Sequence, residues 1–272
     1  MIQSSLPIGI FDSGVGGLTV FKAIAARLPQ ENLMYLGDTA RLPYGTKSGD
    51  TIGRYSRQAA GKLVERGIKM LVIACNTATA AALPLLREAF APLPVLGVIE
   101  PGAQAAVAAS RSGRIAVIAT EATVKGGAYQ RAIQALKPDA EVFGQSCTLF
   151  VPLAEEGWTE GPIVEAICRR YLDTLFSGPE QPDTLVLGCT HFPMLKEALQ
   201  RVVGNDVSIV DSAATAAAAV EAELRRTGAL NTQQGPASRH FMTTDNAARF
   251  AATGSLFLGT PLQQQNVELV DL

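Results

Sequence analysis

Two stretches of sequence decide the fold: MLVIACNTAT at Met70–Thr79 and TLVLGCTHF at Thr184–Phe192. Each is a short apolar run followed by a small residue, a cysteine and a hydroxyl or amide residue. Short runs of Val, Ile and Leu bounded by small residues are typical of strands buried on both faces of a parallel sheet. We therefore expect Cys75 and Cys189 at the carboxyl ends of two strands, where reactive groups gather in α/β folds.

The same alternation of short apolar runs and longer amphipathic or Ala-rich segments continues along the chain. It predicts an α/β fold with mainly parallel sheets. The predicted strands are Ile8–Phe11, Leu33–Leu36, Leu71–Ala74, Val95–Ile99, Ile115–Ala119, Leu185–Leu187 and Val207–Val210. The predicted helices include Leu18–Arg27, Thr51–Arg66, Thr77–Phe90, Ile163–Leu175 and Met194–Val203.

The repeated strand–Cys pattern indicates two similar α/β halves, although strand–Cys–Thr sequences are frequent enough to occur twice by chance. We expect a boundary near Glu100–Gly102. The segment after Val210 contains further α/β material, the Ala-rich Ala213–Leu224 and then Arg239–Thr243, and we expect it to return to the first half. We expect residues 1–99 and 210–272 to form one discontinuous domain and residues 100–209 to form the other. The polar stretch Thr227–Ser238 is predicted to be an exposed loop.

Composition narrows the function classes. The chain has 272 residues, a formal net charge of −2 and 6% aromatic residues, so neither nucleic acid nor a membrane surface is expected as its main partner. The start of the chain lacks the basic and apolar regions of a signal peptide, and no apolar run is long enough to span a bilayer. We therefore expect a cytoplasmic protein, in which thiols stay reduced, so its four cysteines should be free. The spacing of the cysteines does not suit a zinc site.

The two strand-end cysteines suggest a specific reaction. A thiol at the start of a helix lies in a positive field that favours the thiolate. His191, one of two histidines, follows Cys189 by two residues and is a credible proton partner. To invert an α-carbon, one group removes a proton from one face and another delivers a proton to the opposite face. A thiolate and a thiol on opposite sides perform this without moving.

Two polar segments follow the first two predicted strands. Phe11–Gly17 ends in a Gly-rich turn that either binds an anion or is purely structural, and its Asp12 is either a helix cap or an active-site group. The turn fits neither the Walker nor the dinucleotide pattern. Leu36–Gly45 is either an ordered turn or a loop whose N–H groups meet a substrate carboxylate.

Five segments together resemble the signature segments of the bacterial glutamate racemases, which belong to the cofactor-independent aspartate/glutamate racemase family. They occur in chain order and span most of the sequence. The segments are Gly9–Thr19, Gly37–Gly45, Ala74–Thr79, Phe150–Gly157 and Gly188–Pro193.

The resemblance implies two three-layer α/β domains related by a pseudo-twofold axis, with the active site in the cleft between them. It implies interconversion of L- and D-glutamate for peptidoglycan synthesis without pyridoxal phosphate, another cofactor or a metal, in a homodimer. It makes Cys75 and Cys189 the acid/base thiols, facing D-glutamate and L-glutamate respectively, with Asp12 and His191 assisting them. The implied substrate-binding residues are Asp12, Ser13, Tyr44, Gly45, Asn76, Thr77, Thr190 and His191, with Asp38 and Glu155 as further polar members.

Alternatives remain open at this point. The chain could act on aspartate or a hydantoin, could be a redox protein with a reversible Cys75–Cys189 disulfide, or could be a binding protein that kept the fold. Cys147 and Cys168 match no signature segment, and we expect them to be ordinary packed thiols.

Overall fold

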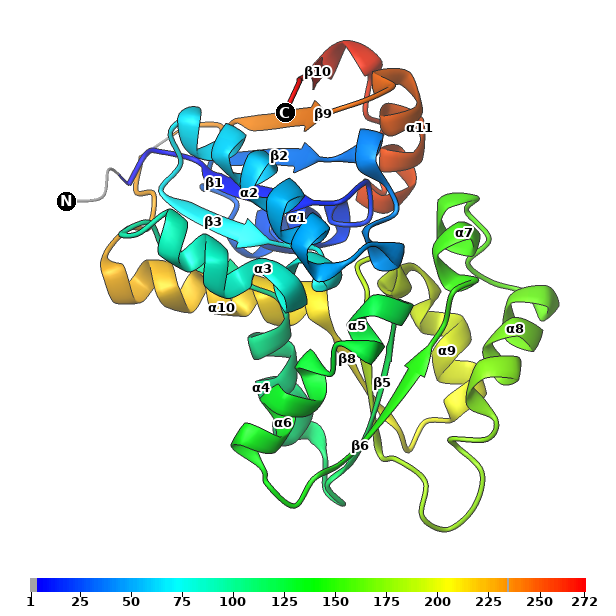
Figure 1. The fold of residues 1–272 in the computed structure, drawn as a ribbon. Helices are drawn as coiled ribbons and strands as arrows, with labels where there is room; N and C mark the ends of the chain where they lie inside the picture. Colours follow the sequence, from blue (N-terminus) through cyan, green and yellow to red (C-terminus); the bar gives the residue numbers. More distant parts are fainter. Residues whose placement is uncertain (1–3, 234) are drawn as a thin grey trace.

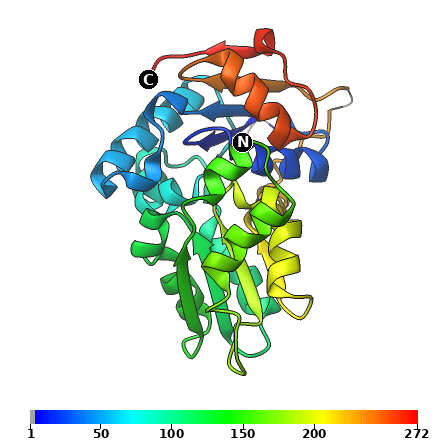
Figure 2. The ribbon, with the colours of Figure 1, turned by 90° about the vertical axis from the view of Figure 1, so that its right-hand side faces the viewer.

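The computed structural model describes residues 4–233 and 235–272 and contains two parallel sheets. One sheet has the strand order β10-β9-β2-β1-β3-β4 and the other has the order β6-β5-β7-β8. Figures 1 and 2 show the sheets as two halves, blue, orange and red above green and yellow. We call the part built on the six-stranded sheet the first half and the part built on the four-stranded sheet the second half. The α/β prediction is confirmed.

The predicted strands are present, with ends that differ by one or two residues. β9 coincides with the stretch Arg239–Thr243 expected to carry α/β material, and two further strands, β6 and β10, complete the sheets. The strands are β1 Ile8–Asp12, β2 Leu33–Gly37, β3 Met70–Ile73, β4 Val95–Gly97, β5 Arg114–Ala119, β6 Glu141–Ser146, β7 Thr184–Gly188, β8 Ser208–Asp211, β9 Arg239–Thr243 and β10 Val267–Leu269.

The helices cover both faces of each sheet. The predicted helices correspond to α1, α2, α3, α8 and α9, the last preceded by one short 3-10 turn. The α-helices are α1 Leu18–Arg27, α2 Gly49–Glu65, α3 Asn76–Ala89, α4 Ile99–Ala109, α5 Glu121–Lys125, α6 Ala128–Leu136, α7 Phe150–Glu155, α8 Pro162–Leu172, α9 Lys196–Val203, α10 Ser212–Thr227 and α11 Ala247–Leu258. The 3-10 turns are η1 Thr39–Arg41, η2 Tyr44–Thr46, η3 Phe192–Leu195 and η4 Gln264–Asn266.

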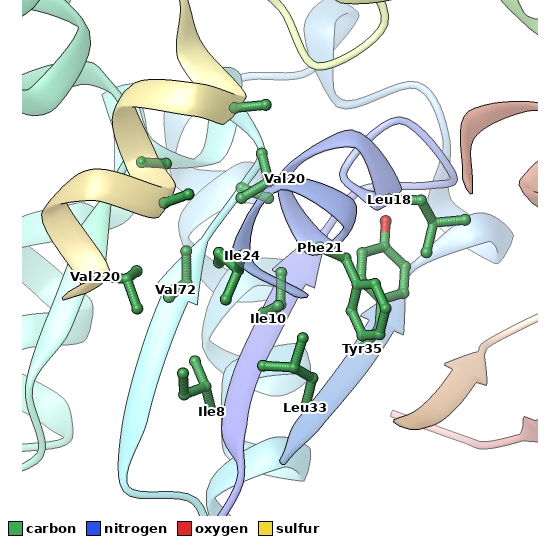
Figure 3. Close-up of a cluster of buried hydrophobic side chains, with 14 of the residues drawn as sticks. Ile8, Ile10, Leu18, Val20, Phe21, Ile24, Leu33, Tyr35, Val72 and Val220 are labelled. Atoms are coloured by element: carbon green, nitrogen blue, oxygen red, sulfur yellow. The ribbon is translucent and has the colours of Figure 1, made fainter. Parts of the chain in front are cut away.

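Alternating side chains of β1 explain the three layers of the first half. Ile8 and Ile10 point to one face and pack against α1 and α10, as Figure 3 shows around α1. Phe11 points to the other face, in the cluster that α2 and α3 complete. Both faces of a parallel strand are therefore buried, which is why β1 is apolar along its whole length.

The second half is layered in the same way. Ile115 and Val117 of β5 pack against α4 and α6. Ala116 and Ile118, which alternate with them, pack against α8 and α9. Each sheet is held by helices on both sides, so the strands lie at fixed positions and their carboxyl ends make a rigid base for a site.

The C-terminal segment adds two strands to the first sheet. β9 pairs with β2, and β10 pairs with β9. β8 belongs to the second sheet, so the predicted boundary after residue 209 passes through this strand. The division into two domains stays a prediction.

In residues 4–233 and 235–272, no helix is long and apolar enough to cross a membrane. Residues 1–3, which belong to the start of the chain that we expect to lack a signal peptide, lie outside the described residues, as does residue 234 of the predicted loop Thr227–Ser238. The described part of that loop after α10 contains neither helix nor strand.

Candidate active site

The carboxyl ends of β1, β3 and β7 meet at one pocket of about 440 Å³, which is large enough for a small molecule. Its walls come from both halves. All the predicted site residues line it except Asp12 and Asp38, which lie behind the wall. The predicted residues in the wall are Ser13, Tyr44, Gly45, Cys75, Asn76, Thr77, Glu155, Cys189, Thr190 and His191.

Cys75 lies between β3 and α3 and is the N-cap residue of that helix. Its sulfur accepts a hydrogen bond from the Ala78 N–H at 3.4 Å and donates one to Ser13 Oγ at 3.5 Å. Burial, followed by the charge of Asp12, raises the pKa of Cys75 to about 12. The expected acidifying effect of the helix start is therefore outweighed, and Cys75 is a protonated thiol at neutral pH.

Cys189 follows β7 and has different neighbours. Its sulfur lies 3.8 Å from His191 Nδ1, and His191 Nε2 lies 3.0 Å from Glu155 Oε1. Burial alone would lower the pKa of His191, but the hydrogen bonds to Cys189 and Glu155 outweigh burial and raise it to about 10. An imidazolium therefore lies beside the Cys189 sulfur at neutral pH.

Asp12 lies at the end of β1 and is 1% exposed. Its Oδ1 accepts a hydrogen bond from the Gly14 N–H at 2.9 Å, and its Oδ2 accepts one from Thr190 Oγ1 at 3.3 Å. Burial raises the pKa of this carboxyl above its usual value, although His191 and these donors oppose the effect. Asp12 thus joins the Gly-rich turn of the first half to the Cys189 turn of the second.

Asp38 supports the Tyr44 loop from behind the pocket. Tyr44 donates a hydrogen bond to Asp38 Oδ2 at 2.6 Å, and Thr244 donates one to Asp38 Oδ1 at 3.0 Å. Gly45 faces the second half closely, because an added Cβ would lie 3.1 Å from Thr120 Cβ. Asp38 is therefore placed to hold the loop in position and does not contact the pocket itself.

A polar cluster joins α3 to the second half at the edge of the pocket. The hydroxyl of Thr77 lies 3.0 Å from that of Thr120 and 3.1 Å from that of Thr123. Asn76 Oδ1 accepts a hydrogen bond from the Tyr129 hydroxyl at 2.8 Å. Within the described residues, the buried Nδ2 of Asn76 has no hydrogen-bond partner. The pocket wall thus offers a free donor.

His191 lies directly over the Gly-rich turn. A Cβ added to Gly16 would lie 2.5 Å from His191 Cε1 and 2.5 Å from Thr190 Oγ1. Any side chain at this position would collide with both groups. The absence of a side chain at Gly16 therefore lets the Gly-rich turn of the first half and the Cys189 turn of the second half approach each other.

The sequence analysis missed the part of the wall that comes from the end of the chain. Arg249, Phe250 and Thr253 of α11 line the pocket, as does Thr120 of the second half. The charge of Arg249 contributes to lowering the pKa of Glu155, after the larger effect of its hydrogen bond to His191. These residues lie in none of the five signature segments, so only the pairing of β9 with β2 indicates that α11 reaches the site.

The remaining thiols lie outside the pocket wall. Cys147 and Cys168 are fully buried in the core of the second half. All four cysteines are free. In the part of the chain that the structure describes, no group of three or more His, Cys, Asp or Glu residues is arranged to hold a metal ion.

Comparison with known proteins assigns the chain to a family. The family model described as Asp/Glu/Hydantoin racemase matches residues 13–220. The chain belongs to this racemase family. A glutamate racemase from Geobacter metallireducens is 51% identical over 258 residues, which are 94% of this chain and 93% of that protein. As a member of this racemase family, the chain is an isomerase.

Solved structures of family members agree with this fold. Glutamate racemase from Thermus thermophilus has a TM-score of 0.89 at 40% identity and covers 99% of this chain and 98% of its own. Glutamate racemase from Francisella tularensis, solved with D-glutamate, has a TM-score of 0.90 at 36% identity and 98% coverage of both chains. An aspartate racemase from Picrophilus torridus, at 18% identity and a TM-score of 0.57, shares the fold alone.

Proposed function

We propose that the chain interconverts L- and D-glutamate by proton transfer between Cys75, Cys189 and the α-carbon. The observation that carries the proposal is that the two thiols line one pocket from different halves. The relatives at 43–51% identity are glutamate racemases, which favours glutamate over aspartate or a hydantoin.

The neighbours of the thiols differ, and we assign the two thiols different roles. Cys189, beside protonated His191, is the base that removes the α-proton of L-glutamate. Cys75, which burial keeps protonated, donates its proton to the opposite face of the carbanion. Cys75 then holds the thiolate and Cys189 the thiol, so the product is D-glutamate and the reverse reaction starts from this second state.

The α-proton of an amino acid is weakly acidic, so the pocket must stabilise the charge that develops on the carboxylate. The free Nδ2 of Asn76 and the hydroxyls of Ser13, Thr77 and Thr120 are the donors that we assign to the substrate carboxylates. Asp12 acts on Cys75 through its charge, and Glu155 holds His191. These donors are fixed before the substrate arrives, which makes them effective in a water-poor site.

Substitution of each thiol tests the two-base mechanism. We expect Cys75→Ala and Cys189→Ala each to abolish racemisation, measured by circular dichroism of glutamate. Cys147→Ala and Cys168→Ala are matched controls, because both thiols are buried outside the pocket wall, and both should stay active. Near-normal racemisation by either pocket variant would refute the mechanism.

Turnover in heavy water separates two bases from one. With two bases, the product enantiomer takes up solvent deuterium before the remaining substrate does. Equal early labelling of both enantiomers would instead support a single base. Parallel assays with aspartate identify the substrate, and free-thiol counting after mild oxidation tests the competing redox function.

We also propose that the D-glutamate produced is used for peptidoglycan synthesis. We place the protein in the cytoplasm, where the thiols of Cys75 and Cys189 stay reduced. The test is growth without added D-glutamate of a bacterial strain that lacks its own glutamate racemase and expresses this chain. Homodimer formation is part of the same proposal and is measured by light scattering.

A further inference from the structure

Tyr129 of α6 contacts the pocket wall from behind. Its side chain is buried, at 1% exposed, and its hydroxyl donates a hydrogen bond to Asn76 Oδ1 at 2.8 Å. Tyr129 belongs to the second half, whereas Asn76 begins α3 of the first half. This hydrogen bond therefore crosses the junction between the halves at a residue that lines the pocket.

The hydrogen bond favours one orientation of the Asn76 amide, because in the other orientation Nδ2 would donate to the Tyr129 oxygen and the buried Tyr129 O–H would lose its acceptor Oδ1. An Asn side chain presents either its carbonyl oxygen or its NH2 group in a given direction. Because Oδ1 is bound to Tyr129, Nδ2 is left as a buried donor without a partner among the described residues. The opposite orientation would direct an acceptor at a substrate carboxylate and repel it.

The tyrosine ring also contacts the turn that carries the second thiol. A Cβ added to Gly188, the residue before Cys189, would lie 3.1 Å from Tyr129 Cε2. A Cβ added to Gly102 of α4 would lie 3.2 Å from the hydroxyl oxygen. The ring is thus held between α4 and β7, and the hydroxyl has little freedom to leave Asn76.

We propose that Tyr129 is a positioning residue that fixes the Asn76 amide with its NH2 group toward the substrate carboxylate. The inference rests on the proposed function, because it assumes that a carboxylate binds beside Asn76. Burial raises the pKa of Tyr129 above its usual value, so the hydroxyl stays a donor at all working pH values. Tyr129 does not contact the pocket and takes no part in proton transfer.

The test is a double-mutant cycle on KM and kcat for glutamate. Tyr129→Phe removes the hydroxyl and keeps the ring, so we expect KM to rise about tenfold with a smaller change in kcat. In the Asn76→Ala background, Tyr129→Phe should have no further effect, because the group that it positions is gone. A purely structural role would give the same loss in both backgrounds.

Tyr171→Phe is the matched control. Its hydroxyl lies 3.2 Å from Thr148 Oγ1 and from the Leu149 N–H, in the same half but outside the pocket wall, and KM should not change. Gly102→Ala provides a second variant that displaces the Tyr129 hydroxyl by a few tenths of an ångström and favours the helix. We expect KM to rise about threefold.

Unchanged KM in both Tyr129→Phe and Gly102→Ala would overturn the inference, as would equal effects of Tyr129→Phe in both backgrounds. If Tyr129→Phe does not fold, the result for Gly102→Ala decides. If the unsubstituted protein racemises glutamate and these variants behave like it, only the role of Tyr129 fails. If the unsubstituted protein does not racemise glutamate, the proposed function itself fails.

Discussion

Gly16→Ala directly tests whether the position of His191 determines activity. The new methyl group would lie 2.5 Å from His191 Cε1 and from Thr190 Oγ1, whereas ordinary contacts begin at 3.4 Å. The ring must therefore move by about 0.9 Å, away from its place between Cys189 and Glu155. A displacement of about 1 Å in a catalytic group costs about a hundredfold in rate, equivalent to about 2.7 kcal/mol.

The assay is racemisation of each enantiomer followed by circular dichroism. L- and D-glutamate have equal free energies, so kcat/KM must fall by the same factor in both directions for any variant. We expect this factor to be about one hundred for Gly16→Ala. Overpacking should also lower the free energy of unfolding by about 1–3 kcal/mol, measured by urea denaturation.

Gly61→Ala is the matched control, because nothing lies within 4 Å of a Cβ at this position in α2. It should retain full activity and gain up to about 1 kcal/mol of stability. If Gly16→Ala is folded and keeps kcat/KM within about threefold of the unsubstituted protein, the reasoning from His191 geometry is refuted.

Three further predictions concern charged side chains, two in the pocket wall and one buried at the amino end of β3. Glu155→Gln removes the carboxylate that keeps the pKa of His191 high, so kcat/KM should fall about tenfold. The alkaline decline of kcat/KM, expected near pH 10 where the imidazolium loses its proton, should move to lower pH. An unshifted pH profile would contradict this prediction. Arg249→Gln removes a cation from the pocket wall, so KM for anionic glutamate should rise about threefold. The salt dependence of kcat/KM should also weaken. An unchanged salt dependence would exclude a role of Arg249 in attracting the substrate. Lys69→Met leaves Glu31 buried without the ammonium group that lies 2.5 Å from its carboxylate. The free energy of unfolding, measured by urea denaturation, should fall by about 3–5 kcal/mol. The double variant Lys69→Met/Glu31→Leu should recover most of this loss.

Part of the fold was predictable from sequence because burial leaves a clear pattern. The central strands β1, β3, β5 and β7 are covered on both faces, so each is a short apolar run. β6, with the sequence EVFGQS, and β10, with the sequence VEL, lie at sheet edges and carry polar residues. These two strands lack a continuous apolar run, so neither was predicted, whereas the edge strands β4 and β8 keep short apolar runs and were.

The same distinction applies to the site. Cys75 and Cys189 were identifiable because each follows an apolar strand, and local sequence determines that position. Thr120 also directly follows an apolar strand, β5, but a hydroxyl in that position does not by itself mark a site. Arg249 and Tyr129 follow no such pattern. They reach the pocket or its supporting side chains only because distant segments pack together, and a single sequence does not display that packing. Local sequence also predicted an acidified Cys75, whereas burial and Asp12 raise its pKa.

The place of α11 in the pocket wall has a consequence for the newly made protein. A ribosome synthesises both cysteines well before it reaches β9 and α11, which add the last side chains of the wall. Chains emerge from the amino end, and contacts between distant segments must wait for the later partner. A nascent chain therefore carries both reactive thiols for some time without a finished site, and it becomes competent for chemistry only after α11 has been synthesised.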